Sequence, residues 1–145
     1  MAHPTVSEVM TPSPVTAVEN ELVLVARERM EQRHCRHLPV LRDEVVVGIL
    51  SARDLDVVSA IANRALDRLV VADVMVTRPY VALFDTPLVD VLAEMEQRKL
   101  GATIVIGPYG GVAGIFTAID ALRLLRQLIA TEDRPAPYLD TSAPQ

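Results

Sequence analysis

Cysteine and aromatic residues are scarce in this chain of 145 residues. Cys35 is the single cysteine, tryptophan is absent, and Phe, Trp and Tyr together make up 3% of the residues. One cysteine cannot build an intrachain disulfide framework or a paired-cysteine zinc site. So few aromatic side chains also argue against a base-stacking platform for nucleic acid. The composition therefore excludes a disulfide-stapled scaffold and disfavours a stacking nucleic-acid binder.

Long apolar runs and an excess of positive charge are also missing. Half of the residues are hydrophobic, yet no run approaches the roughly 20 apolar residues of a transmembrane helix. The N-terminus lacks the basic stretch and apolar core of a signal peptide. The net charge of −5 disfavours broad electrostatic binding to nucleic acid or to an anionic membrane. We therefore expect a cytoplasmic protein with neither a membrane nor a nucleic acid as partner.

What the sequence does contain is an internal repeat. Residues 48–54 and 114–120 share one pattern, which is a glycine, two apolar residues, a hydroxyl residue, two further residues and an aspartate. Upstream, the Val-Met pair at 9–10 recurs at 74–75. A repeat of this length means that one supersecondary unit occurs twice, and it fixes the fold before any single residue is interpreted.

The repeat divides the chain into two units and a tail. We place the first repeat at residues 5–68 and the second at 69–130, and we expect the proline-containing polar stretch 131–145 to be disordered. Each repeat is about half the size of an ordinary domain and exposes an apolar sheet face that it cannot cover alone. Packing the repeats about a pseudo-twofold axis covers both faces and leaves a cleft on either side of the junction.

Apolar periodicity predicts the same elements in both units. The first repeat is predicted to contain a strand at 15–18, a helix at 21–33, hairpin strands at 37–41 and 45–50, and a helix from 51 to about 64. The second is predicted to contain a strand at 81–84, a helix at 87–98, hairpin strands at 102–106 and 111–116, and a helix at 118–129. Residues 70–75 are expected to link the units. The predicted fold class is α+β, with two tandem β-α-β-β-α repeats.

Chemically active side chains gather where the last strand of each repeat meets its last helix. Ser51 and Thr117 fall at expected helix N-caps, where free backbone N–H groups and the positive end of the helix dipole suit a phosphate. Asp54 and Asp120 follow three residues later and can accept two hydrogen bonds from a ribose diol. The same spacing also describes a capping box, which needs no ligand, and a duplicated unit duplicates its caps. The residues alone leave both interpretations open.

The start of the first hairpin adds basic residues to one copy only. Arg36 and His37 can neutralise phosphate charge, and arginine offers planar donors for it. Pro39 leaves its strand one donor short, which suits an edge that lines a pocket. The alternatives are a solvated surface arginine and a histidine packed at a strand start.

Neither catalysis nor metal binding is expected from these residues. A dyad of Ser51 with His34 or His37 has no acidic orienting residue at a recognisable spacing. His34, Cys35 and His37 could be drawn as metal ligands, but a tight site needs three or more convergent ligands, and these lie at one strand start. We therefore expect a protein that is not an enzyme and has no metal site.

The chain resembles the CBS domain family, whose small repeats are named after cystathionine β-synthase. The matching features are Val-Met-Thr-Pro at 9–12, His-Leu-Pro-Val at 37–40 and the glycine–hydroxyl–aspartate segment, with a second copy behind, over about residues 5–130. The resemblance implies a Bateman module, a pair of repeats that binds an adenine nucleotide in the clefts and commonly forms a homodimer. It implies no required cofactor.

The resemblance also implies a set of binding residues. Ser51 and Asp54 would hold phosphate and ribose in one cleft, and Thr117 and Asp120 in the other. The adenine would lie against strand residues, which are Thr16, Ala17, Leu38 and Pro39 in the first repeat and Val81, Ala82 and Thr103 in the second.

The second repeat departs from the family pattern, because Gly101 and Ala102 stand where the first has Arg36 and His37. We therefore expect unequal clefts, with basic residues of one repeat able to serve the opposite cleft, and we favour the one that contains Asp54. Members of the family usually regulate an attached enzyme, channel or transporter. The implied function is a regulatory sensor of AMP, ADP or ATP that modulates a separate partner protein. The alternative is a structural or dimerisation module with vestigial clefts.

Overall fold

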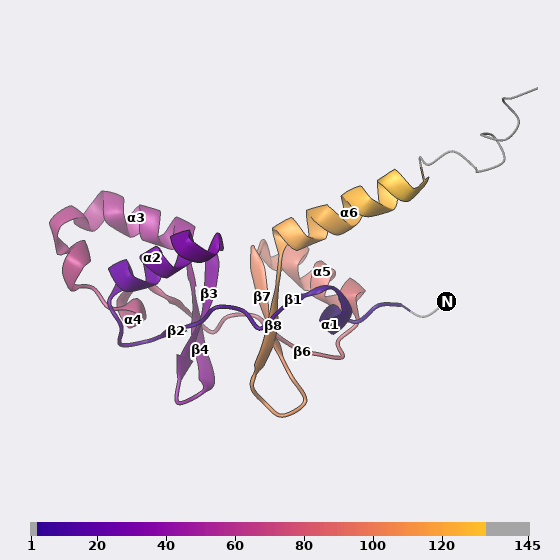
Figure 1. The fold of residues 1–145 in the computed structure, drawn as a ribbon, viewed down its shortest axis with the longest axis horizontal. Helices are drawn as coiled ribbons and strands as arrows, with labels where there is room; N and C mark the ends of the chain where they lie inside the picture. The colour runs from indigo at the N-terminus through magenta and orange to yellow at the C-terminus, as the bar shows by residue number, and fades with distance from the viewer. Residues whose placement is uncertain (1–2, 133–145) are drawn as a thin grey trace, which may run out of the picture.

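The computed structural model describes residues 3–132, apart from the side chains of residues 63–65. The first half contains α1 (Val6–Val9), β1 (Thr11–Pro12), β2 (Ala17–Val18), α2 (Val23–Arg33), β3 (His37–Arg42), β4 (Val45–Ser51), α3 (Ala52–Ala62) and the 3₁₀ helix η1 (Asn63–Arg68). The second contains α4 (Val71–Val74), β5 (Val76–Thr77), β6 (Val81–Leu83), α5 (Leu88–Arg98), β7 (Ala102–Ile106), β8 (Val112–Thr117) and α6 (Ala118–Glu132). Two lobes lie side by side, with the hairpins near their junction and the long helices farther out (Figure 1).

The long helices form where the apolar periodicity predicts them. In α2, Val23, Ala26 and Met30 are buried, and this spacing places them on one helix face. The helix ends at His34, whose left-handed φ of 54° turns the chain back into β3. Helix α5 repeats the arrangement and ends at Lys99 with a φ of 56°. The predicted α+β class with two tandem β-α-β-β-α repeats is confirmed.

Each predicted hairpin forms as an antiparallel pair. Strand β3 pairs with β4, and β7 with β8, while β2 and β6 join their sheets in parallel beside β3 and β7. The β3–β4 turn contains Asp43 and Glu44, both with positive φ, as the primed turns of tight hairpins require. The hairpins therefore present their last residues, Ser51 and Thr117, at the helix starts.

The leading segment of each repeat pairs with the other repeat, which the sequence did not predict. Strand β1 adds to β8 of the second repeat, and β5 adds to β4 of the first, so each sheet has four strands. Residues 70–75, expected as a simple link, instead form α4 and begin β5. The repeats are thus contiguous in sequence but exchange their leading segments in space.

The short helices fix this exchange through hydrogen bonds and burial. The backbone N–H of Val6 donates to the carbonyl of Thr86 at 2.9 Å, and that of Val71 donates to the carbonyl of Glu21 at 2.8 Å. Val6 and Val71 are fully buried, the first among the core residues of the second repeat and the second among those of the first. Separating the lobes would expose both side chains, so the exchange ties the two repeats into one unit.

Thr103 is a buried polar residue in the second sheet, and its hydroxyl has no hydrogen-bond partner within the described residues. An unsatisfied buried hydroxyl destabilises a fold, whereas valine has the same shape without the polar atom. We predict that Thr103→Val raises the free energy of unfolding by about 1 kcal/mol in chemical denaturation. Thr103→Ser, which keeps the hydroxyl and removes a methyl group, should lower it. Equal or reversed effects would contradict this account.

The C-terminal boundary differs slightly from the prediction. Thr131 and Glu132 form the end of α6, and the rest of the stretch predicted as disordered lies outside the described residues. Within residues 3–132, none of the helices has the length and apolar character needed to cross a membrane.

Candidate functional site

Two clefts lie between the repeats, each built around one hydroxyl–aspartate pair. The Asp54 cleft has a volume of about 290 Å³ and is lined by Ser51, Asp54 and residues of the second repeat that include Arg78, Tyr80, Arg98 and Lys99. The Asp120 cleft has a volume of about 510 Å³ and is lined by Thr117, Asp120, Arg123 and residues of the first repeat that include Thr11, Arg33 and Arg36. The volume of the Asp54 cleft is just below the usual range for small-molecule sites, about 300–1,000 Å³, and that of the Asp120 cleft lies within it.

His37 and Gly101 line both clefts. A Cβ atom on Gly101 would lie 3.3 Å from Nε2 of His37, so the absence of a side chain there lets the imidazole of the first repeat approach the second. Burial lowers the pKa of His37, the charge of Arg36 lowers it further, and Asp54 acts in the opposite direction. His37 therefore favours its neutral form at the meeting point of the two clefts.

The lowered pKa of His37 predicts a dependence of stability on pH. The unfolded chain binds a proton near pH 6.5 while the folded chain resists it, so stability falls as the pH drops below about 6.5. We expect the melting temperature to fall between pH 7.5 and pH 5.5, and to fall less in a His37→Gln variant. Thermal melts of both proteins at the two pH values test this, and equal losses would contradict it.

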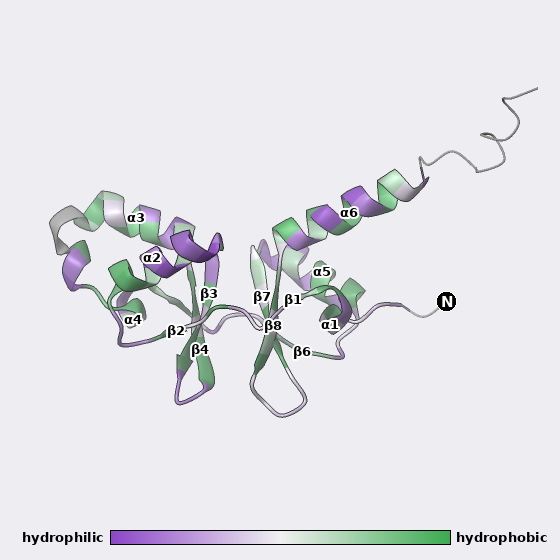
Figure 2. Cartoon of the chain, viewed as in Figure 1, coloured by the Kyte–Doolittle hydropathy of each residue, from purple (hydrophilic) through white to green (hydrophobic). Residues whose placement is uncertain are grey.

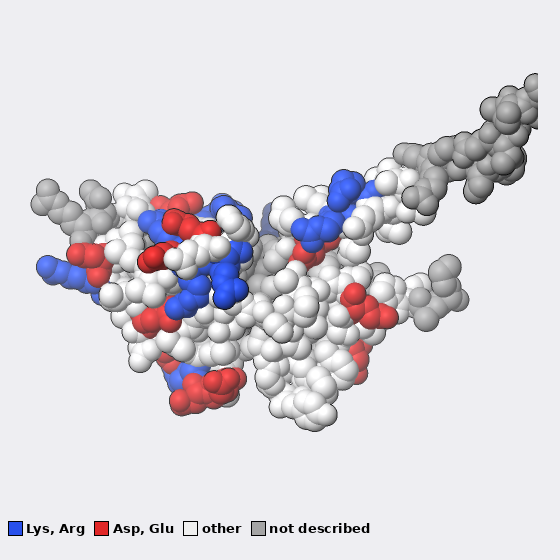
Figure 3. All heavy atoms as spheres, in the orientation of Figure 1, with Lys and Arg blue, Asp and Glu red and all other residues white. Residues whose placement is uncertain are grey.

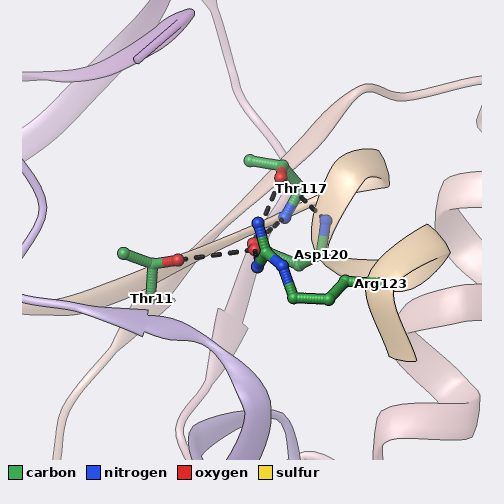
Figure 4. A network of polar contacts seen from close by, with 4 residues as sticks. All are labelled: Thr11, Thr117, Asp120 and Arg123. Carbon is green, nitrogen blue, oxygen red and sulfur yellow. Dashed lines mark hydrogen bonds and ion pairs between the residues drawn. The ribbon is translucent and has the colours of Figure 1, made fainter. Parts of the chain in front are cut away.

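Asp120 is held by a complete network of polar contacts (Figure 4). Its Oδ2 accepts from the backbone N–H of Thr117 at 2.9 Å and from the Thr117 hydroxyl at 3.1 Å, while the Asp120 N–H donates back to Oγ1 of Thr117 at 3.3 Å. Its Oδ1 accepts from Nη1 of Arg123 at 3.0 Å and from the hydroxyl of Thr11 at 3.5 Å. Asp120 is 7% exposed. The second copy of the motif is thus a full capping box with every carboxylate oxygen engaged.

Asp54 differs from Asp120 although the two occupy equivalent positions. Its backbone N–H donates to Oγ of Ser51 at 3.0 Å, so the serine caps α3. No residue within the described chain donates a hydrogen bond to the Asp54 carboxylate or pairs with it as an ion. The side chain is half-buried at the cleft wall. Asp54 therefore keeps its acceptor capacity for another molecule.

Cationic side chains reach each cleft from the opposite repeat. Arg33 and Arg36 of the first repeat line the Asp120 cleft, while Arg78 and Lys99 of the second line the Asp54 cleft. Figure 3 shows basic side chains of the first repeat at the border of the junction between the lobes. A ligand that reaches both the hydroxyl–aspartate pair and these cations must be compact and anionic.

The residues predicted to contact adenine are not among those that line the two clefts. Ala17, Leu38 and Ala82 are at most 4% exposed and pack in the cores of their own repeats. The carbonyl of Thr16 accepts a hydrogen bond from Arg29. Pro39 and Thr103 are buried, and Val81 is partly exposed. The pairing of β5 with β4 brings the stretch before β6, including Tyr80, to the wall of the Asp54 cleft.

Several cleft residues lie outside the set predicted from the sequence, and two of them have a signal in it. Arg78 lies in the second leading segment, which is one basic residue richer than the first. Arg123 lies three residues after Asp120, a spacing at which helical side chains meet. Tyr80, which lies 5.5 Å below the guanidinium of Arg98 measured to the ring centroid, carried no sequence signal.

The described residues of this region offer neither an activated cysteine nucleophile nor a cluster of metal ligands. Burial raises the pKa of the Cys35 thiol, so it is not an activated thiolate. Across residues 3–132, no group of three or more His, Cys, Asp and Glu side chains gathers in a way that could hold a metal ion.

Known proteins resemble this chain in sequence or in structure. A homoserine O-acetyltransferase from Methanococcoides burtonii is 27% identical over 126 residues, which are 86% of this chain and 25% of the relative. The chain thus spans about a quarter of the length of this curated relative.

Solved structures match over most of their length. The crystal structure of CBSX2 in complex with AMP is 26% identical with a TM-score of 0.70, and the match covers 86% of this chain and 97% of that one. The CBS domain of the bacterial CNNM/CorC family Mg²⁺ transporter in complex with ATP is 25% identical with a TM-score of 0.70, and covers 81% and 84%. Residues 6–60 and 71–127, the two repeats that border the clefts, each match the CBS domain, and the chain belongs to the CBS domain family.

Proposed function

We propose that this chain is a regulatory module that binds an adenine nucleotide in the clefts between its repeats and thereby modulates a separate partner protein. Support comes from CBSX2, which was crystallised with AMP, and from the CorC-family CBS domain, which was crystallised with ATP. The ligand on this chain would be AMP, ADP or ATP, with no cofactor required. A cytoplasmic location and the modulation of a partner protein stay predictions.

The observation that carries the proposal is the unengaged carboxylate of Asp54. Both oxygens of this half-buried carboxylate are left to accept hydrogen bonds, and a ribose diol supplies two donors for them. Arg78 and Lys99 line the same cleft and offer positive charge for a phosphate. The N-terminus of α3, capped by Ser51, adds backbone N–H groups. We therefore propose the Asp54 cleft as the first nucleotide site to fill.

Isothermal titration calorimetry tests the proposal directly. The full chain is titrated with AMP, ADP, ATP, NAD and S-adenosylmethionine, and we expect saturable heat with at least one adenine nucleotide. GMP serves as a matched control for the base. Absence of heat with every adenosine compound would remove the nucleotide-binding function.

A second candidate, a dimerisation module, is favoured by the surface of α6. Leu122, Leu125 and Ile129 recur at helical spacing and are 60%, 53% and 51% exposed. Figure 2 shows apolar residues along this helix, which projects beyond its lobe. Exposed apolar side chains grouped on one face are typical of an interaction surface. We propose that this face supports a homodimer, which is compatible with nucleotide binding.

Multi-angle light scattering separates the two candidates when it is combined with calorimetry. A dimer that responds to no nucleotide would favour the structural module with vestigial clefts. A dimer that Leu125→Glu converts to monomer, with calorimetric heat for AMP, would support the sensor and place its assembly on α6. A monomer at all concentrations would contradict the homodimer.

A further inference from the structure

The two aspartates differ because of two positions that are polar beside Asp120 and apolar beside Asp54. Arg123 and Thr11 both donate to Oδ1 of Asp120. Their counterparts in the other copy of the repeat are Val57 and Val76, which cannot donate from their side chains. The difference between the two aspartates therefore lies in the sequence. At Asp120, these donors occupy the carboxylate oxygen that a ribose would need.

We propose that Arg123 makes the Asp120 cleft selective for phosphorylated adenosine ligands over unphosphorylated ones. The inference rests on the proposed nucleotide-binding function. A ribose diol can take Oδ1 of Asp120 only when the Arg123 guanidinium leaves it, because the two compete for the same lone pairs. A nucleoside breaks this ion pair and offers no anion in return. A nucleotide breaks the same pair and supplies a phosphate that the released guanidinium can bind.

The position of Arg123 permits this exchange. Its side chain is 53% exposed, whereas that of Asp120 is 9% exposed, so the arginine can turn toward the cleft while the carboxylate stays fixed by Thr117. Arg33 and Arg36 line the same cleft, so together with Arg123 three arginines border the space that a phosphate would enter. Such a cluster attracts a dianionic ligand strongly, whereas an uncharged nucleoside gains no electrostatic attraction from it.

The Asp54 cleft needs no such exchange. Its carboxylate accepts no hydrogen bond from the described residues, so a ribose can bind it without displacing an ion pair. The two clefts therefore rank ligands differently, with the stronger preference for phosphate in the Asp120 cleft.

The test measures AMP and adenosine affinities by calorimetry in an Asp54→Ala background, which leaves the Asp120 cleft to report. We expect Arg123→Val, which installs the residue of the first repeat, to weaken AMP and strengthen adenosine binding. The ratio of the two affinities should fall by about tenfold, the change that follows from loss of one charge-assisted hydrogen bond. Arg126→Val is the matched control, because it removes the same charge from an exposed position on the same helix that does not line the cleft.

Each outcome decides the inference. If AMP binds and the ratio is the same in the Arg123→Val and Arg126→Val variants, Arg123 only stabilises its helix and the inference is wrong. If AMP binds the wild-type chain but not the Asp54→Ala variant, the Asp120 cleft takes no nucleotide and the inference is also wrong. If the wild-type chain binds no adenosine compound, the proposed function itself fails. Arg123→Lys, which keeps the charge, should preserve most of the ratio.

Discussion

Replacing Asp54 with alanine is expected to weaken AMP binding in its cleft by about a hundredfold, because two hydrogen bonds to a charged acceptor are lost. The melting temperature should stay close to that of the wild-type chain. No described residue donates to this carboxylate, and the cap of α3 comes from the Ser51 hydroxyl, which the variant keeps. Calorimetry and a thermal melt of the same preparation measure the two properties.

The matched control is Asp120→Ala. In the wild-type chain the Asp120 carboxylate accepts from the Thr117 N–H and pairs with Arg123, so the substitution removes a capping interaction and an ion pair. We expect Asp120→Ala to lower the free energy of unfolding by about 1–2 kcal/mol. If Asp54→Ala binds AMP like the wild type, or if it destabilises the chain as much as Asp120→Ala does, the distinction between an unengaged carboxylate at Asp54 and an engaged one at Asp120 is wrong.

Replacing Gly114 with alanine should produce the largest loss of stability among the single substitutions considered. A Cβ atom at this position would overlap the Met10 side chain and lie 2.8 Å from the backbone carbonyl oxygen of Thr11. Side chains can adjust, but the carbonyl belongs to β1, which pairs with β8 at this point. We expect a loss of about 2–3 kcal/mol and a fall in melting temperature of roughly 5–10 °C.

Gly111→Ala is the control for this substitution, since a Cβ atom there would meet nothing within 4 Å and the position lies in the β7–β8 turn. Its melting temperature should remain near that of the wild type. Gly48→Ala should behave like Gly114→Ala, because its Cβ atom would lie 2.9 Å from the carbonyl oxygen of Val76 on β5. A Gly114→Ala variant as stable as Gly111→Ala would show that the leading strand does not pack as closely as the structure has it.

The repeated glycine illustrates how far the sequence analysis reached. A glycine within a strand pattern indicates that another group approaches the backbone closely, and such an approach occurs at both Gly48 and Gly114. The approaching group is the leading strand of the other repeat, β5 or β1. Strands of two residues carry no readable periodicity, and their pairing is a long-range contact, so sequence pattern could not assign them.

The helices and hairpins were easier to predict because their signals are local. Helix α5 was expected at 87–98 and occurs at Leu88–Arg98, and the strand expected at 102–106 is β7. Their apolar residues recur with the period of each structure over many positions. Helix α4, with four residues, is too short to show such a period, and the sequence therefore predicts only a link at residues 70–75.

The sequence by itself determined the duplication, the α+β class and the pairing of a hydroxyl residue with an aspartate at each helix start. It also determined that the two copies differ, since Val57 and Arg123 are written in it. Only the tertiary structure decided which residues line the clefts and which aspartate carboxylate is hydrogen-bonded within the protein. Capping and binding use the same residues at the same spacing, and they differ only in what contacts the carboxylate. For Asp120 that contact includes Thr11, 109 residues away in the chain.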